Sequence, residues 1–380
     1  MVNNKQHTIV WHVDDVKSSH IDSKVNDEFL KWLQMKYGSD NIGKVKATRG
    51  KVHDYLAMKL DYSETGILKV DMTDYVKSMI QEFPEELTGK VKSPWNTNLF
   101  HVDPKSKLLD ETRSKVFHTF VMKGMFLAKR GRQDIMTGIA YLSTKVTNSS
   151  ENDWWKLKRL MLYLKNTANE VCRLEAGDTQ TIQWYVDAAF AVHKDFRSHT
   201  GAVMSLGKGM ISSVSIKQKV NTRSSTEAEL VAIDDVVSKI IWTKRFIENQ
   251  GFQVETNIVY QDNQSTMKLE ENGKESSGKR TRHFNVKYFY VTDLIKKNEL
   301  KIVYCPSDIM IADYMTKPLV GSKFTTFKKA IMNTEVQQEC VVPDKLDDKN
   351  LNPKKVKFKN ESDKKESRNS KRNYHSFVTT

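Results

Sequence analysis

The sequence predicts a mixed α/β (α+β) fold. From residue 182 onward the hydrophobic pattern gives three strands, a helix, a strand, helices, a strand and a helix, an order typical of a mixed sheet flanked by helices. The first half mixes short strand-like runs with segments of helical spacing. Since 38% of the 380 residues are hydrophobic, the chain can bury more than one core, and we expect two or three domains.

In the first half, an apolar run at residues 8–13 predicts a strand, and residues 25–37 predict a helix. A second strand-like stretch covers about residues 51–60. Apolar side chains recur at helical spacing over residues 114–164, so we expect a helical region there.

In the second half, a break at Ala176-Gly177-Asp178 precedes the three strands, at residues 182–190, 200–206 and 210–216. Ser224 to Glu227 is typical of a helix start, and this helix should reach about Phe246. The remaining expected elements are a strand at 257–261, a short helix from about 263, a basic helix over roughly 280–296, a strand at 300–304 and a final helix from about 307.

The charge balance favours an anionic partner. The chain has 61 Lys and Arg residues against 47 Asp and Glu, a formal net charge of +14. Residues 341–380 are lysine-rich and lack apolar periodicity, so we expect a disordered basic tail. The tail holds only part of the excess charge, and it is better interpreted as solvated than as a specific nucleic-acid contact.

Composition argues against several classes of protein. No run of eighteen apolar residues and no charged-then-apolar leader occurs, so neither a membrane span nor a secretory signal is expected. Cys172, Cys305 and Cys340 lie far apart without a CxxC pair, which argues against a disulfide scaffold and a zinc site. An intracellular setting fits best.

Four acidic residues stand at the edges of predicted elements, among apolar or small neighbours: Asp187, Glu229, Asp262 and Asp313. Asp187 lies inside an apolar strand, where a charge is costly unless something offsets it, and a divalent cation would do so. Asp262 ends a strand beside a helix start, a common location for functional groups in α/β sheets.

Glu227 competes with Glu229, because the two side chains point about 200° apart on one helix. The stripe that contains Glu229 is the more apolar, so we expect Glu229 to face the sheet. Hard cations such as Mg²⁺ take oxygen ligands, and two of them held by carboxylates can promote phosphodiester cleavage. Any one of these acids alone is more often solvated or a helix cap.

Five motifs occur in order: YVDA at 185–188, SSTEAEL at 224–230, QDNQS at 261–265, RTRH at 280–283 and ADYMTKP at 312–318. They resemble the ribonuclease H domain of copia-class LTR retrotransposon Pol polyproteins. HVDD at residues 12–15 is similar to the YVDD box of a reverse transcriptase palm, and the resemblance covers about residues 8–330.

The resemblance implies that Asp187, Glu229, Asp262 and Asp313 bind two Mg²⁺ or Mn²⁺ ions and that the domain cuts the RNA strand of an RNA/DNA hybrid. It also implies the organisation of the chain. We expect a partial reverse transcriptase palm and thumb over 1–110, a helical connection over 111–177 and a ribonuclease H-like domain over 178–330.

Asp14 and Asp15 correspond to an incomplete polymerase site. A palm needs a third aspartate on an earlier strand, and the chain starts a dozen residues before Asp14, so polymerase activity is not expected from this chain alone. Other Pol or reverse transcriptase segments are expected partners. Without the resemblance, Asp14-Asp15 is typical of a hairpin turn. The chain departs from the family at His12, which replaces Tyr, Ala57, which replaces Gly, and Gln133, which replaces Pro.

Polar and basic residues beside the four acids are expected to contact nucleic acid. Ser225, Asn263 and Gln264 are suited to reading ribose 2′-hydroxyls, and Arg280 and Arg282 to binding phosphates. His283, in the same basic motif, has two interpretations that stay open: a role in proton transfer or product release, and a phosphate contact.

The sequence leaves two hypotheses for the function, one an enzyme and the other a binding protein. The first is a retrotransposon-derived ribonuclease H that uses a two-metal mechanism. The second is a catalytically inactive nucleic-acid-binding remnant of a decayed retroelement. Binding of a hybrid without cleavage would favour the second.

Overall fold

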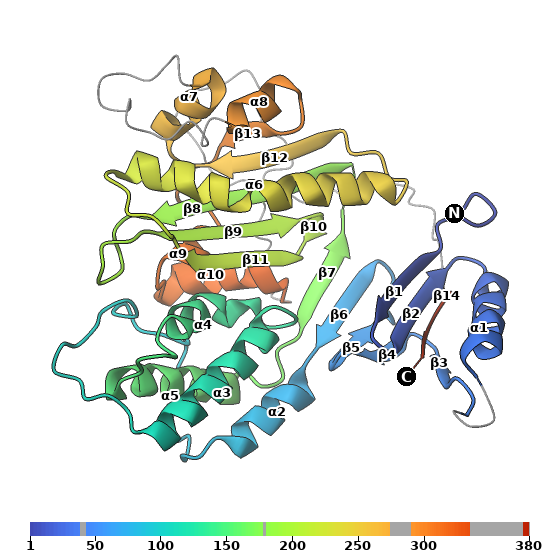
Figure 1. Cartoon of the computed structure of the whole chain (residues 1–380), viewed down its shortest axis with the longest axis horizontal. Coiled ribbons are helices and arrows are strands. Elements are labelled where there is room, and N and C mark those ends of the chain that lie inside the picture. Colours follow the sequence, from blue (N-terminus) through green and yellow to red (C-terminus); the bar gives the residue numbers. More distant parts are fainter. Residues whose placement is uncertain (39–42, 178–179, 274–289, 335–374, 380) are drawn as a thin grey trace, which may run out of the picture. The chain divides into compact units, whose positions relative to one another are not determined.

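The computed structural model describes residues 1–38, 43–177, 180–273, 290–334 and 375–379. The chain forms two compact units, Met1–Gly50 with Gln337–Thr380, and Lys51–Val336. Figure 1 labels the elements of both units. The domain boundaries predicted near residues 110 and 177 fall inside the second unit and stay predictions.

The first unit is a four-stranded antiparallel sheet with one helix. Its strands follow the order β1-β2-β14-β3, and helix α1 begins after Asp22, whose side chain accepts a hydrogen bond from the amide of Lys24. The bounds are β1 Thr8–His12, β2 Asp15–His20, α1 Ser23–Tyr37, β3 Ala47–Arg49 and β14 His375–Thr379. The strand and helix predicted at 8–13 and 25–37 are confirmed.

Strand β14 lies within the predicted disordered tail, so that prediction is wrong for residues 375–379. Backbone pairing with β2 and β3 gives this segment the partners that its composition does not indicate. Residues 341–374 of the tail lie outside the described residues.

The second unit contains a five-stranded sheet of order β10-β7-β6-β5-β4. The strand-like stretch predicted at about 51–60 is confirmed as two strands instead of one, because the chain folds back at Leu56-Ala57 into a hairpin. Both turn residues have positive φ, 52° and 61°, a conformation that glycine adopts more readily than alanine. The bounds are β4 Val52–Tyr55, β5 Met58–Asp61, β6 Ile67–Asp71, β7 Cys172–Ala176 and β10 Gly207–Lys208.

A helical region lies between β6 and β7 in sequence and confirms the helical spacing over residues 114–164. Its apolar positions, such as Phe117, Val121 and Leu157, are fully buried. Helix α5 starts with a reciprocal capping box between Ser150 and Asp153. The bounds are α2 Thr73–Glu82, α3 Glu111–Ala128, the 3-10 turn η1 Gln133–Ile135, α4 Met136–Ser143 and α5 Glu151–Asn166.

A second five-stranded sheet confirms the predicted mixed α/β class. Its order is β11-β9-β8-β12-β13; β11, β9 and β8 pair antiparallel, whereas β12 pairs parallel with both β8 and β13. This is the mixed sheet predicted for a ribonuclease H-like domain. The bounds are β8 Thr181–Ala189, β9 His199–Ser205, β11 Ser212–Lys217, β12 Thr256–Gln261 and β13 Lys301–Tyr304.

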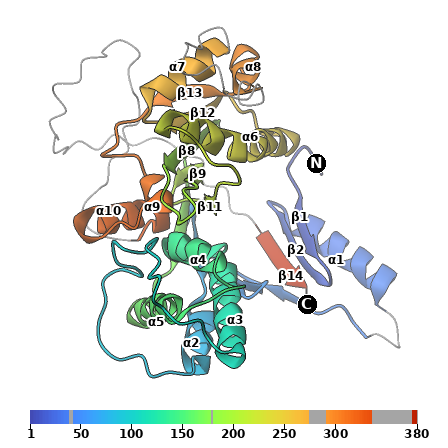
Figure 2. The ribbon, with the colours of Figure 1, turned by 60° about the vertical axis from the view of Figure 1, so that its left-hand side comes forward.

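Helix α6, Ser225–Asn249, lies across one face of this sheet (Figures 1 and 2). The core between them contains alternate residues of β8, namely Ile182, Trp184 and Val186, with Ile233 and Ile240 of α6. Because side chains alternate along a strand, Tyr185 and Asp187 point to the opposite face. The other helices are α7 Gln264–Asn272, α8 Tyr290–Lys296, α9 Asp313–Thr316 and α10 Gly321–Met332.

The final helix is predicted to begin at about Ser307, and this start is wrong, because the first helical residue is Asp313. The chain forms turns up to Ala312, and the helical residues fall into α9 and α10, separated by a segment that contains Pro318. Proline cannot donate a backbone hydrogen bond, and it disfavours a helical conformation in the residue before it, which explains the division. Of the basic helix predicted at 280–296, only α8 lies within the described residues.

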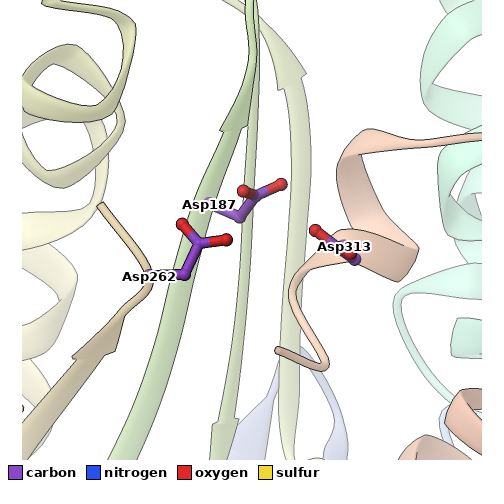
Figure 3. Close-up of side chains that lie close together, drawn as sticks. All are labelled: Asp187, Asp262 and Asp313. Atoms are coloured by element: carbon purple, nitrogen blue, oxygen red, sulfur yellow. The ribbon is translucent and has the colours of Figure 1, made fainter. Parts of the chain in front are cut away.

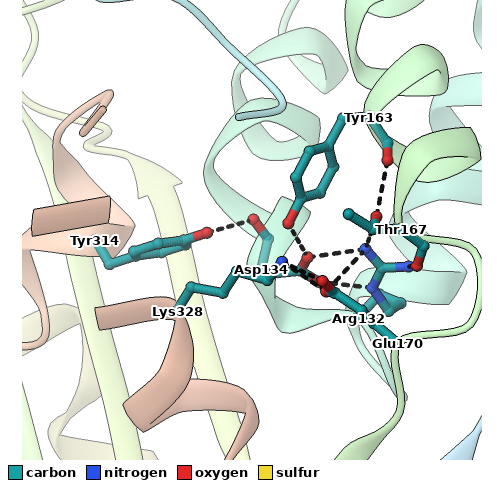
Figure 4. Close-up of polar contacts among 7 residues, drawn as sticks. All are labelled: Arg132, Asp134, Tyr163, Thr167, Glu170, Tyr314 and Lys328. Carbon is teal, nitrogen blue, oxygen red and sulfur yellow. Dashed lines mark hydrogen bonds and ion pairs between the residues drawn. The ribbon is translucent and has the colours of Figure 1, made fainter. Parts of the chain in front are cut away.

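A buried ion pair joins η1 to the helices around it (Figure 4). Arg132 donates two hydrogen bonds to the Asp134 carboxylate, both 2.9 Å long, and the Tyr163 hydroxyl donates a third at 2.6 Å. Burial raises the pKa of Asp134, but the Arg132 guanidinium outweighs it, so the pKa lies below its ordinary value. The backbone carbonyl of Asp134 accepts from the Tyr314 hydroxyl at 2.8 Å, which ties α9 to this network.

Arg132→Met should lower the free energy of unfolding by about 3–5 kcal/mol, because it leaves the Asp134 charge buried without its partner. Urea denaturation followed by circular dichroism would measure this. Lys115→Met is the matched control, since Lys115 pairs with Glu111 on the exposed surface, and a change below about 1 kcal/mol is expected. Equal effects of the two substitutions would contradict the role of the buried pair.

Candidate metal centre

The register of the mixed sheet brings Asp187 and Asp262 together. Tyr260 of β12 pairs with Tyr185 of β8, and the two strands run parallel. Two residues further along, Asp262 therefore leaves β12 at the level where Asp187 lies on β8. This is the carboxyl end of β12, where functional groups of α/β sheets commonly lie.

Asp313 reaches the same place from helix α9. This helix packs against β9 on the face toward which Asp187 points, and the Thr316 hydroxyl donates a hydrogen bond to Asp187. Gly201 of β9, the register partner of Asp187, permits this approach. A Cβ atom at Gly201 would lie 2.5 Å from the Thr316 Cγ2 atom and 2.8 Å from the Met315 Cβ atom.

The carboxylates of Asp187, Asp262 and Asp313 form a cluster in which one oxygen from each lies within 4.8 Å of the others (Figure 3). Asp187 and Asp313 are buried, and Asp262 is half-buried. Three converging carboxylate oxygens are the ligands that Mg²⁺ and Mn²⁺ prefer. The cluster therefore has the chemistry of a divalent-cation site, and three of the four acids predicted as ligands meet in it.

Glu229 lies beside this cluster without being one of its three members. Its side chain is 4% exposed and the backbone amide of Ala188 donates a hydrogen bond to its carboxylate. The Oε2 atom is buried and has no hydrogen-bond partner among the described residues. This is expected of a carboxylate oxygen whose partner is a bound cation. Glu227 instead accepts from the amide of Arg223 at the helix start, so Glu229 is the buried one of the two, as predicted.

The protein environment favours the protonated form of two of these acids. Burial raises the pKa of Asp187 to about 6, with the neighbouring Asp313 and Asp262 adding to the effect. Burial, then Asp187 and Asp262, raise the pKa of Glu229 well above its ordinary value. Such perturbed carboxyl groups are typical of functional sites.

Two lysines and two hydroxyl groups, for which the sequence alone predicts no role, contact the cluster. Lys317 Nζ contacts Asp313 and lies 3.5 Å from Asp187 Oδ2, whereas Lys323 Nζ lies 2.7 Å from Asp313 Oδ2. The Ser307 hydroxyl donates to Asp262 Oδ2 at 2.8 Å. The sequence motif at 312–318 contains Thr316 and Lys317, but it does not indicate where their side chains point.

A chain of buried hydrogen bonds fixes α9 from the side of the sheet. The Ser215 hydroxyl donates to the Met315 carbonyl at 2.7 Å, so its oxygen accepts from His199 Nε2–H at 2.7 Å. His199 Nδ1 then carries no proton and accepts from His193 Nε2–H at 3.0 Å. Burial lowers the pKa of His193 to about 4 and that of His199 to about 3, so both rings are neutral, as this proton arrangement requires.

The residues predicted to contact nucleic acid lie in different settings. Ser225 and Gln264 are exposed, each close in sequence to a carboxylate of the site. Asn263 has a structural role, because its Oδ1 atom accepts from the amides of Ser265 and Thr266 and caps α7. Arg280, Arg282 and His283 lie outside the described residues.

Asp14 and Asp15 lie in the first unit, in the β1–β2 hairpin. His12 pairs with Asp15, and Val13 and Asp14 form the turn, with Val13 at φ 54°. Both interpretations of these residues, a simple turn and a YVDD-like box, predict a hairpin here, so the hairpin does not distinguish them. Within the described residues, the only cluster of three potential metal ligands is the one at Asp187.

The mixed sheet, with an acidic cluster at the carboxyl end of β12, defines a ribonuclease H-like domain. No protein-family model matches the chain. The Pol polyprotein of tobacco transposon TNT 1-94 is 30% identical over 291 residues, 74% of this chain, and that of Arabidopsis thaliana transposon RE1 is 31% identical over 54% of the chain. The Ty1-BR Gag-Pol polyprotein of Saccharomyces cerevisiae is 23% identical over 83% of it.

These matches confirm that the chain is a relative of copia-class retrotransposon Pol polyproteins, as its motifs predict. The chain spans 22% of the length of the tobacco relative, and 14% and 18% of the other two. Together with the sheet topology, they support a ribonuclease H-like domain of a retroelement.

Among solved structures, a foamy viral protease-reverse transcriptase in complex with double-stranded DNA is 12% identical, covers 67% of this chain and 38% of its own, and has a TM-score of 0.40. Ribonuclease H1 from Halobacterium salinarum is 15% identical, covers 36% of this chain and 91% of its own, and has a TM-score of 0.24.

None of the helices that the structure describes combines the length and apolar character needed to cross a membrane.

Gly201→Ala should weaken cation binding, because the added methyl group displaces α9 and Asp313 with it. A loss of about 10-fold or more in Mg²⁺ affinity is expected, comparable with other changes that disturb the support of a metal ligand. Isothermal titration calorimetry would measure it. Gly66→Ala serves as control, because it adds the same methyl group and strains the backbone at its φ of 81°, but its Cβ atom has nothing within 4 Å and displaces no ligand, so the affinity should stay unchanged. An unchanged affinity in Gly201→Ala would contradict the packing argument.

The pKa shifts predict how pH acts on the site. Because the folded protein retains the Asp187 and Glu229 protons to higher pH than the unfolded chain, the free energy of unfolding without metal should fall as pH rises from about 4 to 6. A cation binds the deprotonated groups, so stabilisation by Mg²⁺ should grow over the same range. Thermal denaturation with and without Mg²⁺ would show this. An equal Mg²⁺ effect at about pH 5 and 7 would contradict it.

Proposed function

We propose that this chain is a metal-dependent endonuclease that cleaves the RNA strand of RNA/DNA hybrids. The observation that carries the proposal is the convergence of Asp187, Asp262 and Asp313, with the unpaired buried oxygen of Glu229 beside them. The relationship to retrotransposon Pol polyproteins and the ribonuclease H-like sheet support the same reading.

Asp187, Asp262 and Asp313 would hold Mg²⁺ or Mn²⁺, two ions in the proposed mechanism, and Glu229 would complete the donor set. When bound, divalent cations lower the pKa of water and stabilise a departing oxygen in phosphodiester cleavage. Asp187 and Asp313 are rigid ligands, because both are buried and the Thr316 hydroxyl fixes Asp187. Asp262 is half-buried, so the site opens toward solvent and substrate on its side.

Positive charge on the chain suits a hybrid substrate. The net charge of +14 attracts a polyanion, and affinity should fall as salt is raised. Ser225 and Gln264 are exposed near Glu229 and Asp262, where they would meet the ribose hydroxyls that distinguish RNA from DNA. We assign phosphate contacts to Arg280, Arg282 and His283 from their motif alone.

Asp187→Asn should reduce cleavage of a labelled RNA/DNA hybrid by roughly 10²–10³-fold in Mg²⁺, because it removes one ligand charge from the site. Removal of divalent cations with EDTA should abolish cleavage and added Mg²⁺ should restore it. Glu227→Gln is the matched control, since Glu227 lies two residues from Glu229 and contacts the backbone of Arg223 instead of the cluster.

The alternative function, an inactive nucleic-acid-binding remnant, makes the opposite prediction. The parent protein would then bind the hybrid in a salt-dependent manner without cutting it in Mg²⁺ or Mn²⁺. Cleavage at the parental rate by Asp187→Asn would also reject the proposed site.

A further inference from the structure

Lys317 occupies an unusual position for a side chain of positive charge, because it lies between two acids that are expected to bind a cation. Its ammonium contacts Asp313 Oδ1 and lies 3.5 Å from Asp187 Oδ2. The two carboxylates are 3% and 2% exposed, whereas the Lys317 side chain is 40% exposed. The lysine therefore reaches from the surface into the acidic cluster.

The two lysines of the cluster differ in what they hold together. Lys323 contacts one carboxylate, that of Asp313, and the backbone carbonyl of Ser307. Lys317 alone bridges two acids that come from elements more than a hundred residues apart in sequence. Burial lowers the pKa of Lys317, but Asp187 and Asp313 outweigh it and raise the pKa above its ordinary value, so the bridge carries a full positive charge.

Charge balance disfavours the ammonium beside bound cations. Four carboxylates supply at most four negative charges, which two divalent ions neutralise completely. Lys317 would then add a positive charge beside two cations, on ligand oxygens that the cations need. Its flexible four-carbon stem and its partial exposure give it a route out to solvent.

We propose that Lys317 is a built-in counter-ion of the carboxylate site, which holds Asp187 and Asp313 together in the metal-free protein and competes with divalent cations for their oxygens. The inference rests on the proposed function only in taking the cluster as a cation site. It makes Lys317 a residue that sets cation affinity, and it predicts opposite effects of its removal on the metal-free and the metal-bound protein.

Lys317→Met should lower the melting temperature of the full chain in EDTA, because Asp187 and Asp313 then repel without a bridge. The same variant should bind Mg²⁺ about tenfold more tightly in calorimetry, since no ammonium has to be displaced. Lys317→Arg keeps the charge and should stay near the parent in both measurements. Lys115→Met controls for the loss of one positive charge at a distant exposed site.

A second measurement uses the unmodified protein and does not depend on the folding of a variant. Reductive methylation followed by mass spectrometry reports how accessible each lysine amine is. Methylation of Lys317 should be slow in EDTA and several-fold faster in Mg²⁺, because the cations release the amine. Lys115, whose partner Glu111 is on the exposed surface, should react at the same rate in both.

The outcomes separate the inference from the proposed function. Mg²⁺ binding that is equal or weaker in Lys317→Met, together with methylation of Lys317 that Mg²⁺ leaves unchanged, would overturn the counter-ion role and leave the cation site intact. A parent protein and variants that all fail to bind Mg²⁺ or Mn²⁺ would overturn the cation site, and the inference with it.

Discussion

Repulsion among buried carboxylates is the constraint on which the rest of this structure depends. Two unit charges about 5 Å apart repel by roughly 3 kcal/mol at an effective dielectric constant of about 20. Asp187, Asp262 and Asp313 lie within such a distance of each other, and Glu229 is beside them. Proton uptake, lysine ion pairs and a bound cation are the three ways to reduce that repulsion. The raised pKa of Asp187 and the bridge through Lys317 are the first two of these in the structure.

Parts of the second unit that are far apart in sequence hold the acids in place against this repulsion. The parallel pairing of β8 and β12 fixes two of them, and helix α9 brings the third. Helix α9 is itself held by the chain of neutral hydrogen bonds that ends at the Met315 carbonyl. The Tyr314 hydroxyl also holds it, by donating to the backbone carbonyl of Asp134 in the Arg132–Asp134 network. The site is therefore built jointly by the sheet and by the helical region that precedes it in sequence. A destabilising substitution in either should displace the carboxylates of the site.

The sequence predicted the mixed sheet and its acids because strand alternation and helix spacing are local patterns. The burial of Glu229 rather than Glu227 followed from the apolar stripe alone. Local patterns did not reveal the hairpin turn at Leu56-Ala57, where two non-glycine residues adopt positive φ, nor strand β14, which depends on pairing with distant segments. They also missed Lys317 and Lys323, because the direction of a lysine at a cluster is set by tertiary packing, and a lysine in a motif is ordinarily solvated.

Anomalous diffraction from crystals grown with Mn²⁺ tests the central claim most directly, since it locates the cation without reference to activity. The account predicts a Mn²⁺ peak at bonding distance, about 2 Å, from carboxylate oxygens of Asp187 and at least one of Asp262 and Asp313. Full Mn²⁺ occupancy elsewhere on the protein, with these three acids bare, would contradict it.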